Sequence, residues 1–228
     1  PVVGKQAKEL FEDAQKIIKD IIDQKMISVQ AVYGFWKAVS ENEQVELLSK
    51  KGEVLSKLKF LRNQEAERQI NPCLADYIAP KSSGKEDYIG LFTVVAHTDE
   101  EKIKHYAQAD DYHLLIIRVL ANRFAEAAAE YLHYKVRTDD WGYVNEPFDA
   151  ELMLKEKYQG IRPAPGYPAC PDHSEKVQIF ELLDAEKEIG AKLTENFMVQ
   201  PVASVCGYYF ANPQATYFNV GKISKDQV

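Results

Sequence analysis

The densest group of chemically useful residues is the segment RPAPGYPACPDHSEK, which runs from Arg162 to Lys176. Four prolines fall within nine positions of it, and each removes a backbone donor and fixes φ, so no helix or central strand can run through. The segment is therefore stiff, with few conformations to lose on folding. Gly166 permits a positive φ or the close approach of a ligand. Together with the guanidinium of Arg162 and the ring of Tyr167, this stiff loop suits a small anionic or zwitterionic ligand.

Such a loop could also be only a rigid connector between a strand and a helix. Its full string, Arg-x-x-x-Gly-Tyr followed by Pro-Ala-Cys-Pro-Asp-His, resembles the signature loop of the S-adenosylmethionine-binding activation domain of cobalamin-dependent methionine synthase. The resemblance extends over most of the chain and is carried outside the loop by residues 73–80, 87–90, 125–133, 192–195 and 203–220.

The resemblance implies a site for S-adenosylmethionine, which presents a carboxylate, an ammonium, a sulfonium and an adenosine. Arginine can hold a carboxylate with two parallel hydrogen bonds, which lysine cannot reproduce. Glu126 and Glu156 match acidic family positions near the ammonium and sulfonium, and Tyr167 matches a tyrosine that faces cobalamin. The ligand-binding residues implied by the family are Arg162, Ala164, Gly166, Tyr217, Phe218, Glu126 and Glu156.

Several of these residues have simpler explanations. The Tyr217–Phe218 pair alone would indicate ordinary strand packing, and most glutamates on a helix are solvated. Glu130 and His133 have the Glu-x-x-His spacing of a di-iron bundle, but such a site needs a second copy, and the sequence has none. Cys170 precedes His173 by three residues, yet no third group is identified to orient a Cys–His nucleophile, so we interpret this pair as structural.

Composition narrows the classes of function. With a net charge of −7 and no long basic block, the chain is not expected to bind nucleic acid. Its three cysteines are widely spaced and outside any C-x-x-C, which favours reduced thiols in the cytoplasm over a disulfide framework or a zinc cage. No apolar run is long enough to cross a membrane, no signal-peptide pattern is present, and no glycine-rich nucleotide loop occurs.

Hydrophobic periodicity predicts the elements that position these residues. Apolar residues between 10 and 22 follow one helical stripe, and residues 28–35 and 44–48 are expected to pair as a hairpin through a turn at 40–43. Residues 50–62 are expected to be partly helical, and 87–96 form a buried strand. A capping box at 98–101 opens a helical region that reaches about Lys135.

After the proline-rich loop, Asp172 is the expected N-cap of a helix that Gly190 closes. Residues 199–210 and 215–223 are expected to form a second hairpin around a turn at 211–214. Strands in hairpins predict an α+β fold: a mostly antiparallel twisted sheet with flanking helices, in a single compact domain with a helical subdomain. We expect residues 1–228 to be a fragment of a larger multidomain enzyme, truncated at both ends.

By resemblance, the parent enzyme converts homocysteine to methionine, and this domain offers S-adenosylmethionine for the reductive methylation of inactive cob(II)alamin. The implied partners are the cobalamin-binding domain of the same chain and reduced flavodoxin or an equivalent reductase, without nucleic acid or membrane. Flavodoxins are acidic, so docking would need a basic patch, for which Lys50, Lys51, Lys57, Lys59 and Arg62 are candidates.

Other features of the family lie outside these residues. Cobalamin is bound mainly by another domain, zinc belongs to the parent enzyme only, and a ligand-binding aspartate lies ahead of this sequence. The fragment alone is not expected to make methionine. Two alternatives stay open: a stand-alone S-adenosylmethionine-dependent methyltransferase, or a docking module for cobalamin and flavodoxin that binds no ligand.

Overall fold

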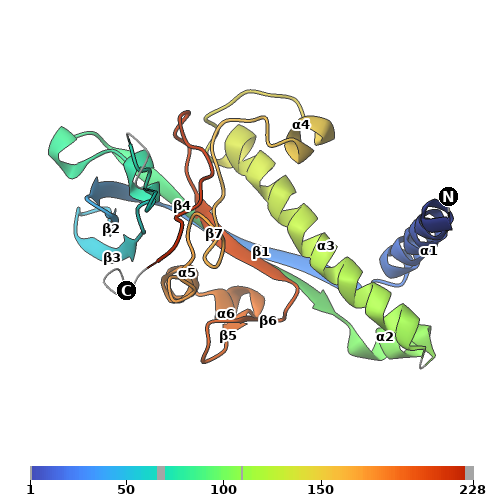
Figure 1. Ribbon diagram of the computed structural model, residues 1–228. Helices are drawn as coiled ribbons and strands as arrows, with labels where there is room; N and C mark the ends of the chain where they lie inside the picture. Colours follow the sequence, from blue (N-terminus) through green and yellow to red (C-terminus); the bar gives the residue numbers. More distant parts are fainter. Residues whose placement is uncertain (1, 66–69, 109, 224–228) are drawn as a thin grey trace.

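A five-stranded sheet in the order β3-β2-β1-β4-β7 forms the centre of the computed structural model, which describes residues 2–65, 70–108 and 110–223. Every neighbouring pair of strands is antiparallel (Figure 1). The strands are β1 (Ile27–Glu41), β2 (Gln44–Leu48), β3 (Val54–Lys59), β4 (Asp87–Thr98) and β7 (Ser204–Tyr209). The expected hairpin turn is confirmed, with Glu41 opposite Gln44 and Asn42 in the turn at φ 55°. The expected pairing of residues 28–35 with 44–48 is wrong, because β2 pairs with residues 37–41 at the end of β1, whereas residues 28–35 pair with β4.

Six helices are described around this sheet, and only α2–α3 and α5–α6 follow each other through short turns. The helices are α1 (Val2–Asp23), α2 (Glu100–Ala107), α3 (Asp111–Lys135), α4 (Ala150–Leu154), α5 (Lys176–Leu183) and α6 (Ala185–Ile189). The smaller elements are the 3-10 turns η1 (Leu74–Tyr77) and η2 (Lys81–Ser83), the π-helical turn η3 (Val136–Asp140), and the strand pair β5 (Lys192–Leu193) and β6 (Val199–Gln200).

Strand β4 is covered on both faces, which explains its nearly unbroken apolar sequence. Because successive side chains of a strand point to opposite faces, Leu91 and Val95 enter the core packed by α5 and α6. Phe92 and Val94 enter a separate core, together with Ala129 of α3. The buried strand predicted at 87–96 is confirmed, and α3 is thereby fixed across one face of the sheet.

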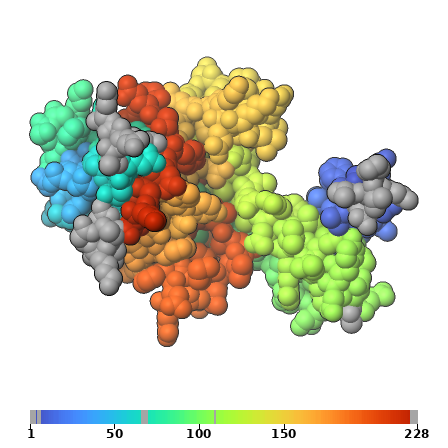
Figure 2. All heavy atoms as spheres, viewed as in Figure 1, coloured from blue at the N-terminus to red at the C-terminus, as the bar shows by residue number. Residues whose placement is uncertain are grey.

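Helices α1 and α2, with the beginning of α3, form a lobe at one side of the molecule (Figure 2). Ile17 and Ile21 of α1 are buried against Ile103 of α2, each side chain contributing about 1.5–3 kcal/mol. The predicted amphipathic helix is confirmed, but its stripe is only partly covered. Leu10 and Phe11 remain 51% and 63% exposed.

Two predicted elements are wrong. Residues 50–62 contain strand β3 and no helix, because the backbone of 54–59 pairs with β2, and this pairing outweighs the local helix preference of Lys and Leu. No strand occurs within the described residues of 215–223, so the second hairpin does not form. Strand β7 pairs with β4 on one side, and Ile161 occupies its other side through a bridge to Phe210.

The helix expected from Asp172 to Gly190 starts later and is interrupted. Asp172 accepts hydrogen bonds from the backbone and hydroxyl of Ser174, which makes a local turn, and α5 begins at Lys176. Asp184 adopts φ 48°, which separates α5 from α6, and Gly190 ends α6 as expected. The helical region to Lys135 is confirmed as two helices, with Asp99 accepting from the backbone of Lys102 at the start of α2.

The α+β class with an antiparallel sheet, predicted from hairpin-like strands, is confirmed in a single compact domain. In the described part of the chain, no helix has both the length and the apolar character needed to cross a bilayer.

Candidate functional site

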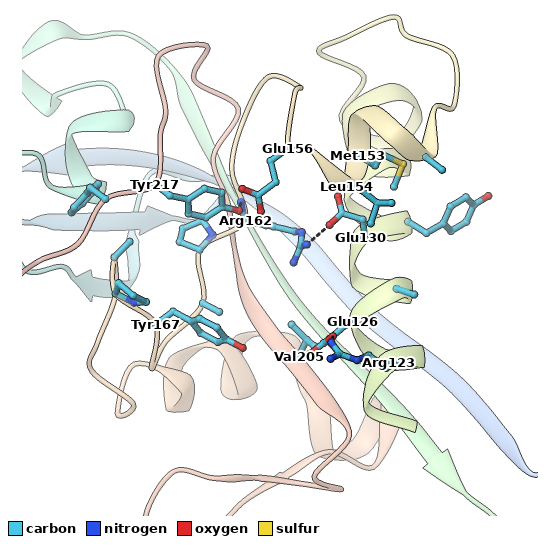
Figure 3. Close-up of a pocket in the computed structure, with 18 of the residues that line it drawn as sticks. Arg123, Glu126, Glu130, Met153, Leu154, Glu156, Arg162, Tyr167, Val205 and Tyr217 are labelled. Carbon is cyan, nitrogen blue, oxygen red and sulfur yellow. Dashed lines mark hydrogen bonds and ion pairs between the residues drawn. The ribbon is translucent and has the colours of Figure 1, made fainter. Parts of the chain in front are cut away.

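A cavity of about 920 Å³ lies between α3, the α4 region and the proline-rich loop (Figure 3). Its apolar walls include Ala127, Phe148, Met153, Leu154, Val205 and Phe218. Five charged side chains line it as well: Arg123, Glu126, Glu130, Glu156 and Arg162. Mostly apolar walls with a few convergent polar groups are typical of a small-molecule site.

The loop reaches the cavity because its first residues extend the sheet. Ile161 and Phe210 exchange backbone hydrogen bonds of 3.0 Å, and the carbonyl of Pro163 accepts from the Tyr208 N–H, also at 3.0 Å. Gly207 makes this approach possible, since a Cβ there would overlap the Pro163 carbonyl oxygen. Gly207 was missed in the sequence, where a glycine within a strand was the available signal of a close backbone approach.

Gly166 closes the turn of the loop. Its φ is +98°, and its N–H donates to the carbonyl of Cys170 at 2.7 Å. A Cβ at this position would lie 2.8 Å from Nε2 of His173 and closer still to Cε1, so the ring fills the space that a side chain would need. Gly166 is not among the residues that line the cavity. Its positive φ and the packed His173 ring give it a conformational role in the loop, and its contact with a ligand stays a prediction.

Arg162 lies at the inner end of the loop, with 20% of its side chain exposed. Its Nη2 donates to Oε2 of Glu130, and its backbone N–H donates to the Tyr217 hydroxyl at 3.0 Å. Burial acts to lower the pKa of Arg162 and the Glu130 carboxylate acts to raise it; the pKa ends above its ordinary value. The guanidinium is therefore charged and already ion-paired within the domain.

Helix α3 presents Glu126 and Glu130 one turn apart on the same wall. Glu126 accepts from Nη1 of Arg123 at 2.6 Å in an exposed pair, whereas 19% of the Glu130 side chain is exposed. Glu130 was not predicted as a site residue. Its spacing of four from Glu126 was the signal that places both on one helix face.

Glu156 enters the cavity from the end of the α4 region, next to Arg162 and Tyr217 (Figure 3). Its backbone lies in the left-handed region at φ 50°, which is uncommon for a residue with a Cβ. Within the described residues, no hydrogen bond or ion pair holds its carboxylate. Among the described residues, the cavity thus contains one carboxylate outside any ion pair, beside two that are paired.

Three aromatic residues, Tyr167, Tyr217 and Phe218, line the side of the cavity that faces α3. The Tyr217 hydroxyl accepts the Arg162 N–H, and burial raises the pKa of Tyr217. Phe218 packs against the main core and also lines the cavity, so its packing role and its site role coincide. Tyr167 is 64% exposed at the mouth.

The Glu-x-x-His spacing on α3 serves two different purposes. His133 is buried, stacked on Tyr209 with ring centroids 5.2 Å apart, while Glu130 pairs with Arg162. Burial, followed by the charges of Arg137 and Arg162, holds the pKa of His133 well below its usual range. His133 is thus a neutral core residue at physiological pH.

Cys170 and His173 do not form a nucleophile pair. Cys170 is buried, which raises the pKa of its thiol. His173 lies against Gly166, and its Nδ1 is 2.6 Å from Nζ of Lys176. Nucleophilic cysteines need the opposite conditions, a lowered pKa and access.

Seven of the eight residues predicted for ligand or cobalamin contact line this one cavity, and Gly166 is the exception. The seven are Glu126, Glu156, Arg162, Ala164, Tyr167, Tyr217 and Phe218. They come from α3, the α4 region, the loop and the segment after β7, so only the fold brings them together.

Comparison with known proteins identifies the family of this chain. Residues 1–228 match the family described as the activation domain of vitamin B12 dependent methionine synthase. The chain is also similar to a solved crystal structure, that of the MetH reactivation domain bound to AdoHcy, with a TM-score of 0.93 and 43% sequence identity. That match covers 100% of this chain and 72% of the other. On both grounds, the chain belongs to the activation-domain family of cobalamin-dependent methionine synthase, a methyltransferase.

Proposed function

We propose that this domain binds S-adenosylmethionine in the cavity beside Arg162 and supports the reductive methylation of oxidised cobalamin, which another domain of the parent enzyme holds. The observation that carries the proposal is the cavity itself, where one largely buried guanidinium meets mostly apolar walls and an uncompensated carboxylate at Glu156. The AdoHcy bound by the similar reactivation domain supports the same ligand class, since it shares the adenosine and amino-acid ends.

The charges of the cavity match the ligand's ends. Arg162 would receive the carboxylate through the guanidinium donors that Glu130 does not use. Glu126 and Glu156 would face the ammonium and the sulfonium. Adenosine would lie against Tyr217 and Phe218, near the backbone of Ala164.

Transfer itself needs little acid–base chemistry from the protein. The sulfonium methyl has to point out of the cavity mouth, where Tyr167 would face the corrin ring. Orientation of this kind lowers a barrier by holding two reactants in a near-attack geometry. The chain would thus contribute binding and alignment, while the cofactor supplies the reactivity.

The proposed partners are the cobalamin-binding domain of the parent chain and reduced flavodoxin or an equivalent reductase, in the cytoplasm. Homocysteine, folate and zinc would be handled elsewhere in the parent enzyme. Part of the expected basic patch is neutralised within the domain: Lys57 pairs with Glu46, and Arg62 pairs with Asp76, both at 2.7 Å. The charges left for an acidic reductase are those of Lys50, Lys51 and Lys59.

Replacing Arg162 tests the binding site directly. We expect Arg162→Ala to lose at least about tenfold in affinity for S-adenosylmethionine, because a charged hydrogen bond contributes about 1.5–3 kcal/mol. Arg162→Lys should restore little, since it keeps the charge but not the planar fork. Isothermal titration measures the affinity, and thermal unfolding checks that each variant folds.

Arg118→Ala is the matched control, because Arg118 is exposed on α3 and outside the cavity lining. Unchanged affinity in Arg162→Ala would remove the proposed site. A wild-type chain that binds no ligand would favour a docking module, and methyl transfer to a small substrate without cobalamin would favour a stand-alone methyltransferase.

A further inference from the structure

Glu130 is held from two directions at the inner wall of the cavity. Its Oε2 accepts from Nη2 of Arg162, and its Oε1 accepts from the Tyr158 hydroxyl at 3.0 Å. The Glu130–Arg162 contact is the dashed line in Figure 3. Both side chains are about four-fifths buried, so water screens this pair less than the exposed pair of Arg123 and Glu126.

Tyr158 is fixed in its turn by a second arginine. The Arg137 guanidinium lies over the Tyr158 ring at 3.8 Å from the centroid, and the His133 ring meets Tyr158 edge-on at 5.2 Å. Arg137 is only 1% exposed and is ion-paired with Glu146. Since packing leaves the ring little freedom, the direction of its O–H bond toward Glu130 is well defined.

We propose that Glu130 is a positioning residue, which holds the Arg162 guanidinium in the orientation that receives the ligand's carboxylate, with Tyr158 holding Glu130. This inference rests on the proposed S-adenosylmethionine site. A guanidinium has five N–H donors, of which Glu130 takes one on Nη2 and the one on Nε is buried, so the remaining Nη donors are left for a ligand. A free arginine side chain would lose about 2 kcal/mol of rotamer entropy on binding, and Glu130 removes much of that loss beforehand.

Glu130 also balances the positive charge of this buried region. Arg137 and Arg162 both lie close enough to His133 to lower its pKa, so two guanidiniums share one buried region beside a neutral imidazole. Glu146 compensates Arg137 and Glu130 compensates Arg162. Without Glu130, the buried Arg162 guanidinium would lack a counter-charge, which costs desolvation free energy, or its side chain would turn toward solvent.

The test measures how the loss of affinity depends on the ligand's tail. Isothermal titration of the full chain uses S-adenosylhomocysteine, its analogue without the amino group, and methylthioadenosine, which lacks the whole amino-acid tail. For Glu130→Gln, we expect about a tenfold or greater loss for both carboxylate-bearing ligands and little change for methylthioadenosine. Tyr158→Phe should show a smaller loss with the same pattern, and it removes no charge, so it serves if Glu130→Gln folds poorly.

Glu151→Gln is the control for loss of a helix carboxylate, because Glu151 forms an exposed pair with Lys155 outside the lining. Loss confined to the ligand with an amino group would mean that Glu130 contacts the ammonium directly, and it would overturn the positioning role. Equal loss for all three ligands, no loss, or tighter binding would overturn it too. A wild-type chain that binds none of them would refute the proposed function instead.

Discussion

Gly166→Ala is the substitution whose cost can be worked most directly from the structure. A backbone at φ +98° is strained for any residue with a Cβ, at about 1–3 kcal/mol. The new methyl would also overlap the His173 ring, and overpacking of this kind adds about 1–3 kcal/mol. Together these costs should lower the free energy of unfolding by about 2–6 kcal/mol, and each kcal/mol lowers Tm by ~2–4 °C in a chain of this size.

Urea and thermal denaturation measure this cost, and Gly84→Ala separates its two parts. Gly84 has φ 63° and no heavy atom within 4 Å of the place where a Cβ would stand, so it carries the backbone strain alone. Its substitution should cost about 1–2 kcal/mol. In a His173→Ala background, Gly166→Ala should cost less than in the wild type, with a coupling of about 1–3 kcal/mol.

Equal costs at Gly84 and Gly166, or additive effects of Gly166 and His173, would refute this account of the loop. The result also bears on binding. Pro163, Ala164 and Tyr167 line the cavity from the same loop, so a turn distorted at Gly166 should weaken the binding of S-adenosylhomocysteine as well. Gly84→Ala, which lies in a turn outside the lining, should leave that affinity unchanged.

Two further predictions concern acidic residues. Burial raises the pKa of Glu175 to about 7 from an ordinary 4.5, so the folded protein keeps the proton to higher pH than the unfolded chain. The free energy of unfolding should fall between about pH 4.5 and 7, by at most ~1.4 kcal/mol per unit, and urea titrations of Glu175→Gln should lack this component. Glu156→Gln should weaken cationic S-adenosylmethionine more than neutral S-adenosylhomocysteine in isothermal titration; equal losses for the two ligands would argue against a carboxylate facing the sulfonium.

The parts of the fold that the sequence predicted are those whose signal is local. The turn residues at 40–43 placed the β1–β2 hairpin, and the capping-box pattern at 98–101 placed the start of α2, whose N-cap is Asp99. The failures at 50–62 and 215–223 share one physical cause. Whether a segment forms a strand depends on whether it can pair with the edge of a sheet. Ile161, far from β7 in sequence, pairs at the β7 edge that the predicted hairpin would have used.

The features of the site also divide into those with a local sequence signal and those that depend on the fold. Its residue types could be proposed from the proline-rich loop and its family resemblance, but the Arg162–Glu130 ion pair joins residues 32 positions apart. Nothing in the spacing of Glu130 distinguishes a partner for Arg162 from a solvated helix carboxylate. Gly166 shows the converse: its sequence context allowed a positive φ or the approach of a ligand, and the structure shows the positive φ, with the His173 ring where a Cβ would stand.

The two walls of the cavity are fixed by different means, and this difference bears on how the ligand is bound. The loop wall is held by backbone pairing with β7 and by the Gly166 turn, so it would offer rigid positions to the proposed ligand at Arg162 and Ala164. The α3 wall carries its charges on side chains, of which Glu130 is held by Tyr158 and Arg162. Rigid groups cost little entropy when a ligand binds, so most of the affinity should arise where both walls meet at Arg162. An internal ion pair at that point is therefore compatible with ligand binding, because it orients the guanidinium while leaving donors for the ligand.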